Sequence, residues 1–187
     1  IVEKILILAG GYSNEREISL ITAKSVIHEL KKNKKYRILL IEPDGSFVKK
    51  LRKFKPNLVL NLLHGRYGED GYIQSILESE KVKYSHSGVL SSSLAIDKEL
   101  SKKIFIKNNI LTPRYIKFSF QNKFNKKNII KKIDKYLKFP VVLKPINEGS
   151  SVGVFICNKK NFNINLMKLE KFKDILIEKY IPGREIQ

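Results

Sequence analysis

The fold is decided by residues 3–30, which read EKILILAGGYSNEREISLITAKSVIHEL. Residues 3–9 form a short apolar run that ends at a pair of glycines, a pattern typical of a buried parallel strand followed by a tight turn. A helix is predicted next, because Asn14 and Glu17 have the spacing of a capping box and the following apolar residues recur every three or four positions. This order of strand, turn and helix indicates an α/β fold.

Two further buried strands are predicted at residues 36–41 and 57–63, and a second helix at about 72–79. A turn at residues 43–46 ends the first of these strands. Because strands alternate with helices, we expect βαβ units, a parallel sheet and a Rossmann-like domain over residues 1–96.

The pattern changes near residue 97. Helical spacing covers about 89–108 and recurs in a Lys/Asn-rich stretch at 121–138, whose lysines we interpret as a solvated face. Strands are predicted at 114–118, 139–144, 152–156 and 174–179, with a weak helix in the 160s. With antiparallel pairing around a Gly/Ser turn, residues 97–187 are expected to form an α+β unit.

Both ends of the sequence read as cut. Ile1 opens directly into a strand pattern without a Met, and residues 183–187 read as a continuing strand. We therefore expect a fragment of a longer protein, with one domain followed by an incomplete second one. A chain of 187 residues can bury roughly two thirds of its unfolded surface, so a real core is expected.

The composition is strongly basic, with 37 Lys and Arg against 18 Asp and Glu, and a net charge of +19. Basic excess is the electrostatic footprint of phosphate binding, so a nucleic-acid partner is one interpretation. However, 31 of these residues are Lys, and a Lys-for-Arg bias from genome composition would give the same charge. Only Phe124 and Tyr136 interleave the lysines of 121–138 as base-stacking aromatics, so we expect no nucleic-acid partner.

The single cysteine, Cys157, excludes a disulfide framework and a Cys-based zinc site. It indicates a reducing compartment, so a cytoplasmic location is expected. No apolar run approaches the ~18 residues of a membrane span and no signal peptide opens the chain, so no membrane partner is expected.

The best candidate for phosphate chemistry is the segment 144–154, KPINEGSSVGV, because neither a Walker A motif nor G-x-G-x-x-G is present. A strand delivers Lys144 beside a turn in which Gly149 and Gly153 let the backbone approach a ligand. Serine hydroxyls and successive N–H groups of the turn can cradle an anion. An ordinary β-hairpin turn is the alternative, and the pattern leaves both open.

A second candidate site follows the first strand, at the sheet edge where open α/β folds bind ligands. If Asn14 caps the helix, Glu15 lies on its first turn facing the crevice, where a carboxylate could bind a substrate ammonium. Glu17 is better explained by the helix dipole.

His64 lies at the end of the third predicted strand and precedes a loop with glycines at 65, 68 and 71, which permit close approach of a ligand. His28, on a helix, and His86, in a Ser-rich turn, lack such a context.

Together with weaker signals, these motifs form an ordered set. They are Gly10-Gly11-x-Ser13-x-Glu15-Arg16-Glu17, Leu63-His64-Gly65-x-x-Gly68-Glu69-Asp70-Gly71, Ser87-Gly88-Val89, Asp97-Lys98, Lys144-Pro145, Glu148-Gly149-Ser150-Ser151-x-Gly153 and Glu178-Lys179-Tyr180-Ile181-x-Gly183-x-Glu185. In this order the chain closely resembles the D-alanine:D-alanine ligase family of ATP-grasp enzymes, over essentially its whole length.

The resemblance implies an ATP-dependent joining of two D-alanines for peptidoglycan synthesis. In that reaction ATP converts the carboxylate of the first D-alanine into an acylphosphate, which the amine of the second attacks. The resemblance implies that Glu15 binds the ammonium of the first D-alanine, with Ser150 in the same hydrogen-bonded group and His64 nearby.

For the nucleotide, the resemblance implies that Lys98 and Lys144 contact the phosphates and that the loop 148–153 closes over them. The remaining nucleotide contacts that it implies are Glu148, Gly149 and Ser151 in that loop, Glu178, Lys179, Tyr180 and Ile181 at the adenine edge, and Glu185 at the ribose hydroxyls.

The resemblance also places the ligands of Mg²⁺ beyond residue 187, so no metal ligand is expected here and the chain alone is expected to be inactive. His86 stands where the family usually has glycine. The family is commonly dimeric, so a homodimer is one expectation. Another ATP-grasp carboxylate-amine or carboxylate-hydroxyl ligase is the alternative.

Overall fold

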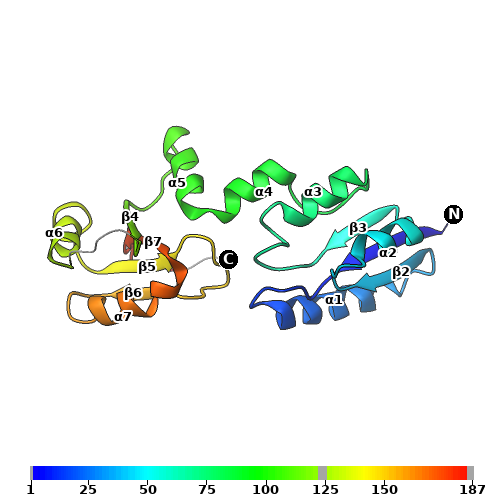
Figure 1. Cartoon of the computed structure of the whole chain (residues 1–187), viewed down its shortest axis with the longest axis horizontal. Coiled ribbons are helices and arrows are strands. Elements are labelled where there is room, and N and C mark those ends of the chain that lie inside the picture. The colour runs from blue at the N-terminus through cyan, green and yellow to red at the C-terminus, as the bar shows by residue number, and fades with distance from the viewer. Residues whose placement is uncertain (1, 122–125, 185–187) are drawn as a thin grey trace. The chain divides into compact units, whose positions relative to one another are not determined.

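The computed structural model describes residues 2–121 and 126–184, and only the backbone of residues 126 and 127. The chain divides into two compact units, Ile1–Ile96 and Asp97–Gln187, and each has its own sheet and hydrophobic core (Figure 1). Among the helices of the described residues, none is long and apolar enough to cross a membrane.

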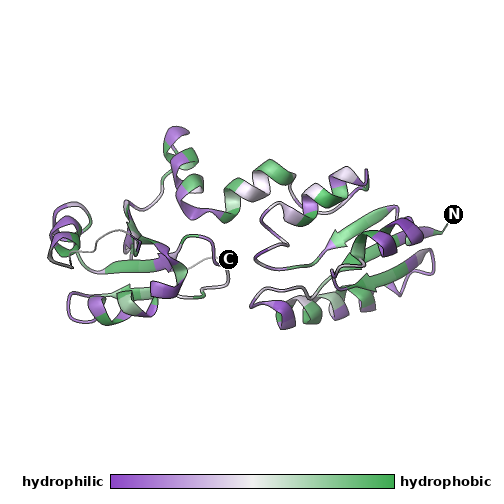
Figure 2. Ribbon diagram, in the orientation of Figure 1, coloured by the Kyte–Doolittle hydropathy of each residue, from purple (hydrophilic) through white to green (hydrophobic). Residues whose placement is uncertain are grey.

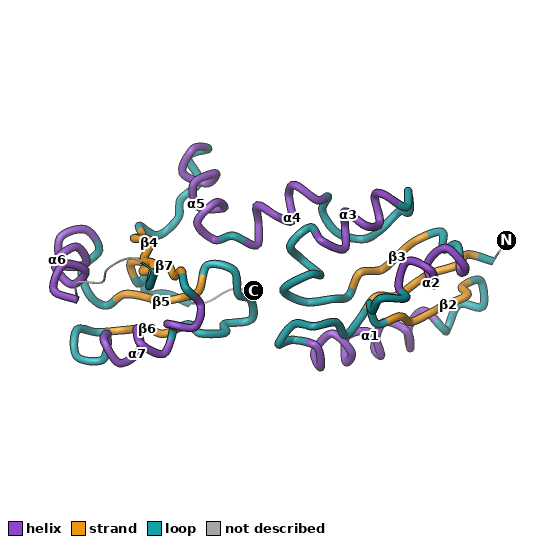
Figure 3. Tube along the Cα trace, in the orientation of Figure 1, coloured by secondary structure: helices purple, strands orange, loops and turns teal. Residues whose placement is uncertain are grey.

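The first unit is built on a three-stranded parallel sheet in the order β2-β1-β3 (Figure 3). The strands are β1 (Glu3–Leu8), β2 (Tyr36–Ile41) and β3 (Leu58–Asn61), and the helices are α1 (Arg16–Leu30), α2 (Phe47–Phe54), α3 (Tyr72–Ser79) and α4 (Val89–Ile96). Ile5 of the central strand pairs with Ile38 on one side and Leu58 on the other. This is the parallel α/β arrangement that the alternation of strands and helices predicts.

The central strand is buried on both faces, which explains its continuous apolar sequence. Leu6 and Leu8 pack with residues of α2 and α3, whereas Ile5 and Ile7 pack with Ala23 of α1. Strands are accordingly among the greenest segments in Figure 2. Helices on both faces leave the ends of the strands as the place where a site can form.

In the first unit, the expectation for the helix cap was wrong and one helix was missed. Asn14 does not cap α1, which begins at Arg16 with Glu15 as its N-cap residue and no side-chain cap. Ser13 instead closes a turn, because its hydroxyl accepts from the N–H of Glu15 at 3.1 Å. Helix α2 was not predicted, although the apolar residues Phe47, Leu51 and Phe54 have helical spacing.

The second unit has a four-stranded antiparallel sheet in the order β4-β7-β5-β6. The strands are β4 (Tyr115–Ser119), β5 (Val141–Pro145), β6 (Phe155–Cys157) and β7 (Asp174–Lys179), and the helices are α5 (Lys98–Lys107), α6 (Lys126–Tyr136), α7 (Phe162–Lys168) and the short 3₁₀ turn η1 (Glu170–Phe172). The predicted antiparallel α+β unit is therefore confirmed.

Helices α6 and α7 supply the apolar side of this core. Ile129, Ile133, Phe162 and Leu166 pack with strand residues such as Val141. The lysines at positions 131, 132 and 135 are exposed, as expected for a solvated face.

Several boundaries in the second unit differ from expectation, and β4 and β5 are shifted by one or two residues from the predicted 114–118 and 139–144. The helical pattern at 89–108 is two helices, because Asp97 is extended and caps α5 by accepting from Leu100 N–H at 2.9 Å. Strand β6 starts at Phe155 rather than at residue 152. Strand β7 ends at Lys179, and residues 180–184 form no strand, while 185–187 lie outside the described residues.

Candidate active site

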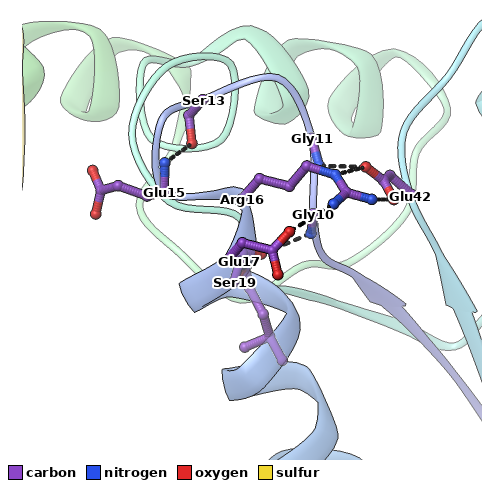
Figure 4. A network of polar contacts seen from close by, with 9 residues as sticks. Gly10, Gly11, Ser13, Glu15, Arg16, Glu17, Ser19 and Glu42 are labelled. Atoms are coloured by element: carbon purple, nitrogen blue, oxygen red, sulfur yellow. Dashed lines mark hydrogen bonds and ion pairs between the residues drawn. The ribbon is translucent and has the colours of Figure 1, made fainter.

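Two glycines end β1 and open the loop that carries the first motif. Gly10 and Gly11 both have a φ of +84°, a conformation that residues with a Cβ rarely adopt. The N–H of Gly10 donates to Ser19 Oγ at 2.8 Å, and this hydroxyl donates to the carbonyl of Leu62 at 2.6 Å. One buried hydroxyl on α1 therefore joins the residues that follow β1 and β3, and Figure 4 shows its contact with Gly10.

A bidentate ion pair lies beside this loop (Figure 4). Nε and Nη2 of Arg16 lie 2.6 and 2.8 Å from the two carboxylate oxygens of Glu42, and the N–H of Gly11 donates to Glu42 Oε1 at 3.3 Å. The hydrogen bond from Arg16 lowers the pKa of Glu42. Sequence reasoning missed Glu42, although its place just after a strand that neighbours β1 was a usable signal.

Glu15 and His64 come from different loops of the first unit and lie close together. A Cβ added to Gly65 would lie 3.2 Å from Glu15 Oε1, so the carboxylate reaches the residue next to His64. Nε2 of His64 is buried and has no hydrogen-bond partner among the residues that the structure describes. His64 also lines a cavity of about 740 Å³, together with Tyr12 and Tyr72. His64 therefore forms part of the cavity wall, with its Nε2 atom buried behind the surface.

The glycine loop that follows His64 is held by its own acidic residues. The N–H of Gly65 donates to Glu69 Oε2 at 2.7 Å, and the N–H of Tyr67 donates to Asp70 Oδ2 at 2.8 Å. Glu69 and Asp70 therefore stabilise the conformation of the loop.

His86 contacts the same loop through Asn61. Its φ is +118°, a value that favours glycine, which is the residue usual at this position in the family that the sequence resembles. Nδ1 of His86 lies 2.8 Å from Nδ2 of Asn61, which also donates to the carbonyl of Gly68 at 2.8 Å. Since the Asn61 amide is the donor, Nδ1 of His86 is the acceptor.

The second unit gathers most of the nucleotide-contact residues expected from the sequence around one cavity of about 430 Å³. The members of that set on its wall are Lys98, Lys144, Glu148, Gly149, Ser151, Glu178, Lys179, Tyr180 and Ile181. Ser150, which was expected to orient the substrate with Glu15, lies on the same wall. They come from α5, β5, the loop after β5 and the end of β7. Glu185 lies outside the described residues, and Glu15 and His64 belong to the first unit.

Lys98 anchors the start of the Gly/Ser loop. Its ammonium donates to the carbonyls of Ile146, at 3.3 Å, and Glu148. Burial lowers the pKa of Lys98, and the positive charge of Lys144 lowers it further, while the carboxylates of Glu148 and Glu178 oppose this shift. An anion that enters the cavity would favour the charged form of Lys98, because it would offset the effects of burial and of the neighbouring ammonium.

The loop at residues 146–154 joins two antiparallel neighbours, β5 and β6, so the hairpin interpretation describes its connection. It is longer than a tight turn and contains Ser150 and Ser151 at φ of 45° and 60°. Val152 N–H donates to the carbonyl of Gly149 at 2.9 Å. Because the loop also lines the cavity beside Lys144, the same segment can be both a hairpin connection and an anion-binding loop.

Glu178 links a lysine of the cavity wall, Lys144, to a buried lysine, Lys102. Its Oε2 lies 2.6 Å from Lys144 Nζ, and its Oε1 lies 2.9 Å from Lys102 Nζ. Side-chain exposure is 6% for both Glu178 and Lys102 and 24% for Lys144, so only Lys144 opens toward solvent. Sequence reasoning missed Lys102, since a lysine inside a Lys-rich helix gives no local signal of burial.

The described residues hold no group of three or more His, Cys, Asp or Glu side chains that could bind a metal ion. The positive groups of the second-unit cavity instead suit an anion. Ammonium groups and a loop rich in backbone N–H are the donors that phosphate oxygens prefer.

Comparisons with known proteins agree with this arrangement. Residues 104–187 match the family model described as D-ala D-ala ligase C-terminus. A D-alanine--D-alanine ligase of Pelagibacter ubique is 62% identical over 185 residues, which are 99% of this chain and 60% of the relative. The chain thus spans about three fifths of the length of that relative.

Solved structures show the same likeness. A D-alanine--D-alanine ligase of Bacillus anthracis has a TM-score of 0.84 and 37% identity over 97% of this chain and 59% of that one. A structure of the Bacillus anthracis enzyme complexed with ATP has a TM-score of 0.80 and 33% identity, over 97% and 60% of the two chains. By sequence and by fold, the chain is therefore similar to D-alanine–D-alanine ligases over nearly its whole length.

Proposed function

We propose that this chain supplies the D-alanine-binding part and the first nucleotide-binding lobe of an ATP-dependent ligase that makes D-alanyl-D-alanine for peptidoglycan. One observation carries the proposal. Lys98 and Lys144, from separate elements, line one cavity together with the Gly/Ser loop and the end of β7. The chain is also similar to ligases of this name over nearly its whole length.

The chemistry begins with a poor acyl donor. An oxygen of the first D-alanine carboxylate attacks the γ-phosphorus of ATP, the bond to the β-phosphate oxygen breaks, and ADP leaves. The nitrogen of the second D-alanine then attacks the acyl carbon, loses a proton and expels phosphate. Lys98 and Lys144 offset negative charge on the oxygens during transfer.

The first unit would hold the amino acid. Glu15 is proposed to bind the ammonium of the zwitterion, because its carboxylate lies close to Gly65. His64 would lie nearby, and its Nε2 has no hydrogen-bond partner among the described residues. Ser150, in the loop of the second unit, is proposed to join Glu15 in orienting the substrate.

The cavity of the second unit would hold the nucleotide. Its size of about 430 Å³ is that of a small-ligand site. In addition to the two lysines, we assign Glu148, Gly149 and Ser151 to the phosphates.

The end of β7 is proposed to meet the base and sugar, with Glu178, Lys179, Tyr180 and Ile181 at the adenine edge and Glu185 at the ribose. Mg²⁺ would screen the phosphate oxygens when bound, and we propose that its ligands lie outside the described residues. The reaction needs ATP, which is consistent with a cytoplasmic protein. A homodimer is proposed from the family likeness alone and would show as twice the chain mass in light scattering.

The direct test is a chimaera in which this chain replaces the matching residues of the Pelagibacter ubique relative. Phosphate release from ATP should depend on D-alanine, and D-alanyl-D-alanine should form in equal amount. ATP hydrolysis that ignores D-alanine, or dependence on a different acceptor, would contradict the proposal. The 187-residue chain alone should release no phosphate with D-alanine.

A further inference from the structure

A buried lysine lies behind the cavity of the second unit. Lys102 is 5% exposed, and its ammonium contacts Glu178 Oε1 at 2.9 Å and donates to Thr112 Oγ1 at 2.7 Å. The same ammonium lies 5.3 Å from the centroid of the Tyr115 ring. Lys102 is not among the described residues that line the cavity, whereas Glu178 is, so Glu178 is the residue that joins Lys102 to the cavity wall.

Glu178 divides its two oxygens between two lysines. Oε1 faces Lys102, and Oε2 lies 2.6 Å from the ammonium of Lys144, which does line the cavity. This Lys102–Glu178–Lys144 triad carries one net positive charge. A ligand in the cavity would meet this positive charge at Lys144, because the Lys102 side chain is buried and the Lys144 side chain is partly exposed.

We propose that Lys102 is a positioning residue for nucleotide binding: it offsets the charge of Glu178, so that Glu178 competes less with phosphate oxygens for the ammonium of Lys144. The inference rests on the proposed function, since it takes the anion to be the phosphates of ATP. An ammonium has three N–H donors, and the Glu178 contact needs only one of them.

The alternative arrangement shows why the rear lysine matters. Without Lys102, the buried carboxylate would have Lys144 as its one ion-pair partner in the triad, and in a low-dielectric site that pair would tighten. The triad would then have no net charge. An incoming phosphate would have to compete with Glu178 for Lys144.

This reasoning makes a charge-rescue prediction. Lys102→Met keeps an unbranched side chain that is one atom shorter, and it lowers the net charge of the triad to zero. Adding Glu178→Gln to that variant removes the competing negative charge and restores one positive charge, now on Lys144 alone. The Gln amide keeps the size and one hydrogen-bond-accepting oxygen of the side chain that we assign to the adenine edge. Lys102→Met should therefore weaken nucleotide binding, and the double variant Lys102→Met/Glu178→Gln should recover most of it.

The experiment uses the chimaera and measures KM for ATP and for D-alanine, with kcat. We expect Lys102→Met to raise the KM for ATP about tenfold or more, with little change in the KM for D-alanine. The double variant should return the KM for ATP to within about threefold of the unmodified chimaera. Lys103→Met is the matched control, because it removes a lysine from the same helix whose side chain is 57% exposed.

Three outcomes separate the possibilities. If the unmodified chimaera shows no D-alanine-dependent phosphate release, the proposed function fails. If the chimaera works but Lys102→Met leaves the KM for ATP unchanged, only the inference is overturned. If Lys102→Met and the double variant lose activity equally, with kcat following the folded fraction by circular dichroism, Lys102 is only structural and the inference is again overturned. If Lys102→Met alone fails to fold, the double variant decides: a near-normal KM for ATP supports the triad and a raised one refutes it.

Discussion

The hydroxyl of Ser19 accepts a hydrogen bond from the backbone N–H of Gly10 at 2.8 Å, at the point where β1 ends. It also donates to the carbonyl of Leu62 at 2.6 Å. A single buried side chain on α1 thus satisfies two backbone groups that lie at the ends of neighbouring strands. The loops that carry Glu15 and His64 both start from these strand ends.

Ser19→Ala should destabilise the protein, because it leaves the N–H of Gly10 and the carbonyl of Leu62 without this buried partner. The expected loss is about 2 kcal/mol in the free energy of urea unfolding. Ser25→Ala is the control, since Ser25 lies on the same helix but is exposed. Equal stability of the two variants would show that the buried hydroxyl does not hold the loop.

Gly153→Ala should destabilise the second unit. Gly153 has a φ of +71°, and an added Cβ would lie 2.9 Å from both Leu169 Cδ2 and Pro145 Cγ. Strain and overpacking together should cost about 2 kcal/mol. Gly45→Ala is the comparison, because a Cβ at Gly45 would meet nothing within 4 Å. The measurement is urea unfolding, and a loss no larger than that of Gly45→Ala would be evidence against the tight packing of the loop.

The Arg16–Glu42 pair predicts an acid-dependent stability. The pKa of Glu42 is lowered from 4.5 in the folded protein, so its contribution is complete above pH 4.5 and disappears as the pH falls through the lowered value. Because both side chains are more than a third exposed, screening by solvent keeps this contribution small.

The comparison is between the parent chain and Glu42→Gln in urea at pH 7 and at acidic pH. The two proteins should differ at pH 7 and converge in acid. A difference that grows in acid would contradict the pair.

Glu15→Gln in the chimaera should raise the KM for D-alanine about tenfold or more and leave the KM for ATP nearly unchanged, because a charge-assisted contact to an ammonium is lost. Glu17→Gln is the matched control, since Glu17 is two residues away, 81% exposed and paired with Arg16. If Glu17→Gln has the larger effect on D-alanine, the assignment of Glu15 fails.

The sequence predicted most of the architecture because local patterns dominate in these elements. The strand at 36–41, the helix at 72–79 and the strand at 174–179 are found within those limits, since each combines regular apolar spacing with clear turn residues. The capping box failed because Ser13 offers a competing turn one residue earlier.

The parts of the site that depend on distant contacts could not be read from the sequence. Glu42 acts on a loop 26 residues away through Arg16, and Lys102 pairs with a carboxylate on β7. Nothing near either residue indicates its partner, because ion pairs between elements depend on how the strands are ordered in the sheet. The Gly/Ser loop was found because its unusual composition is itself local.

The most direct measurement follows an oxygen atom through the reaction. The chimaera is supplied with ATP and with D-alanine whose carboxylate carries ¹⁸O, and the released phosphate is analysed by mass spectrometry. Attack of that carboxylate on the γ-phosphorus, followed by cleavage at the acyl carbon, transfers one ¹⁸O into each phosphate. The account predicts this single labelled oxygen, and phosphate that carries no label would contradict it.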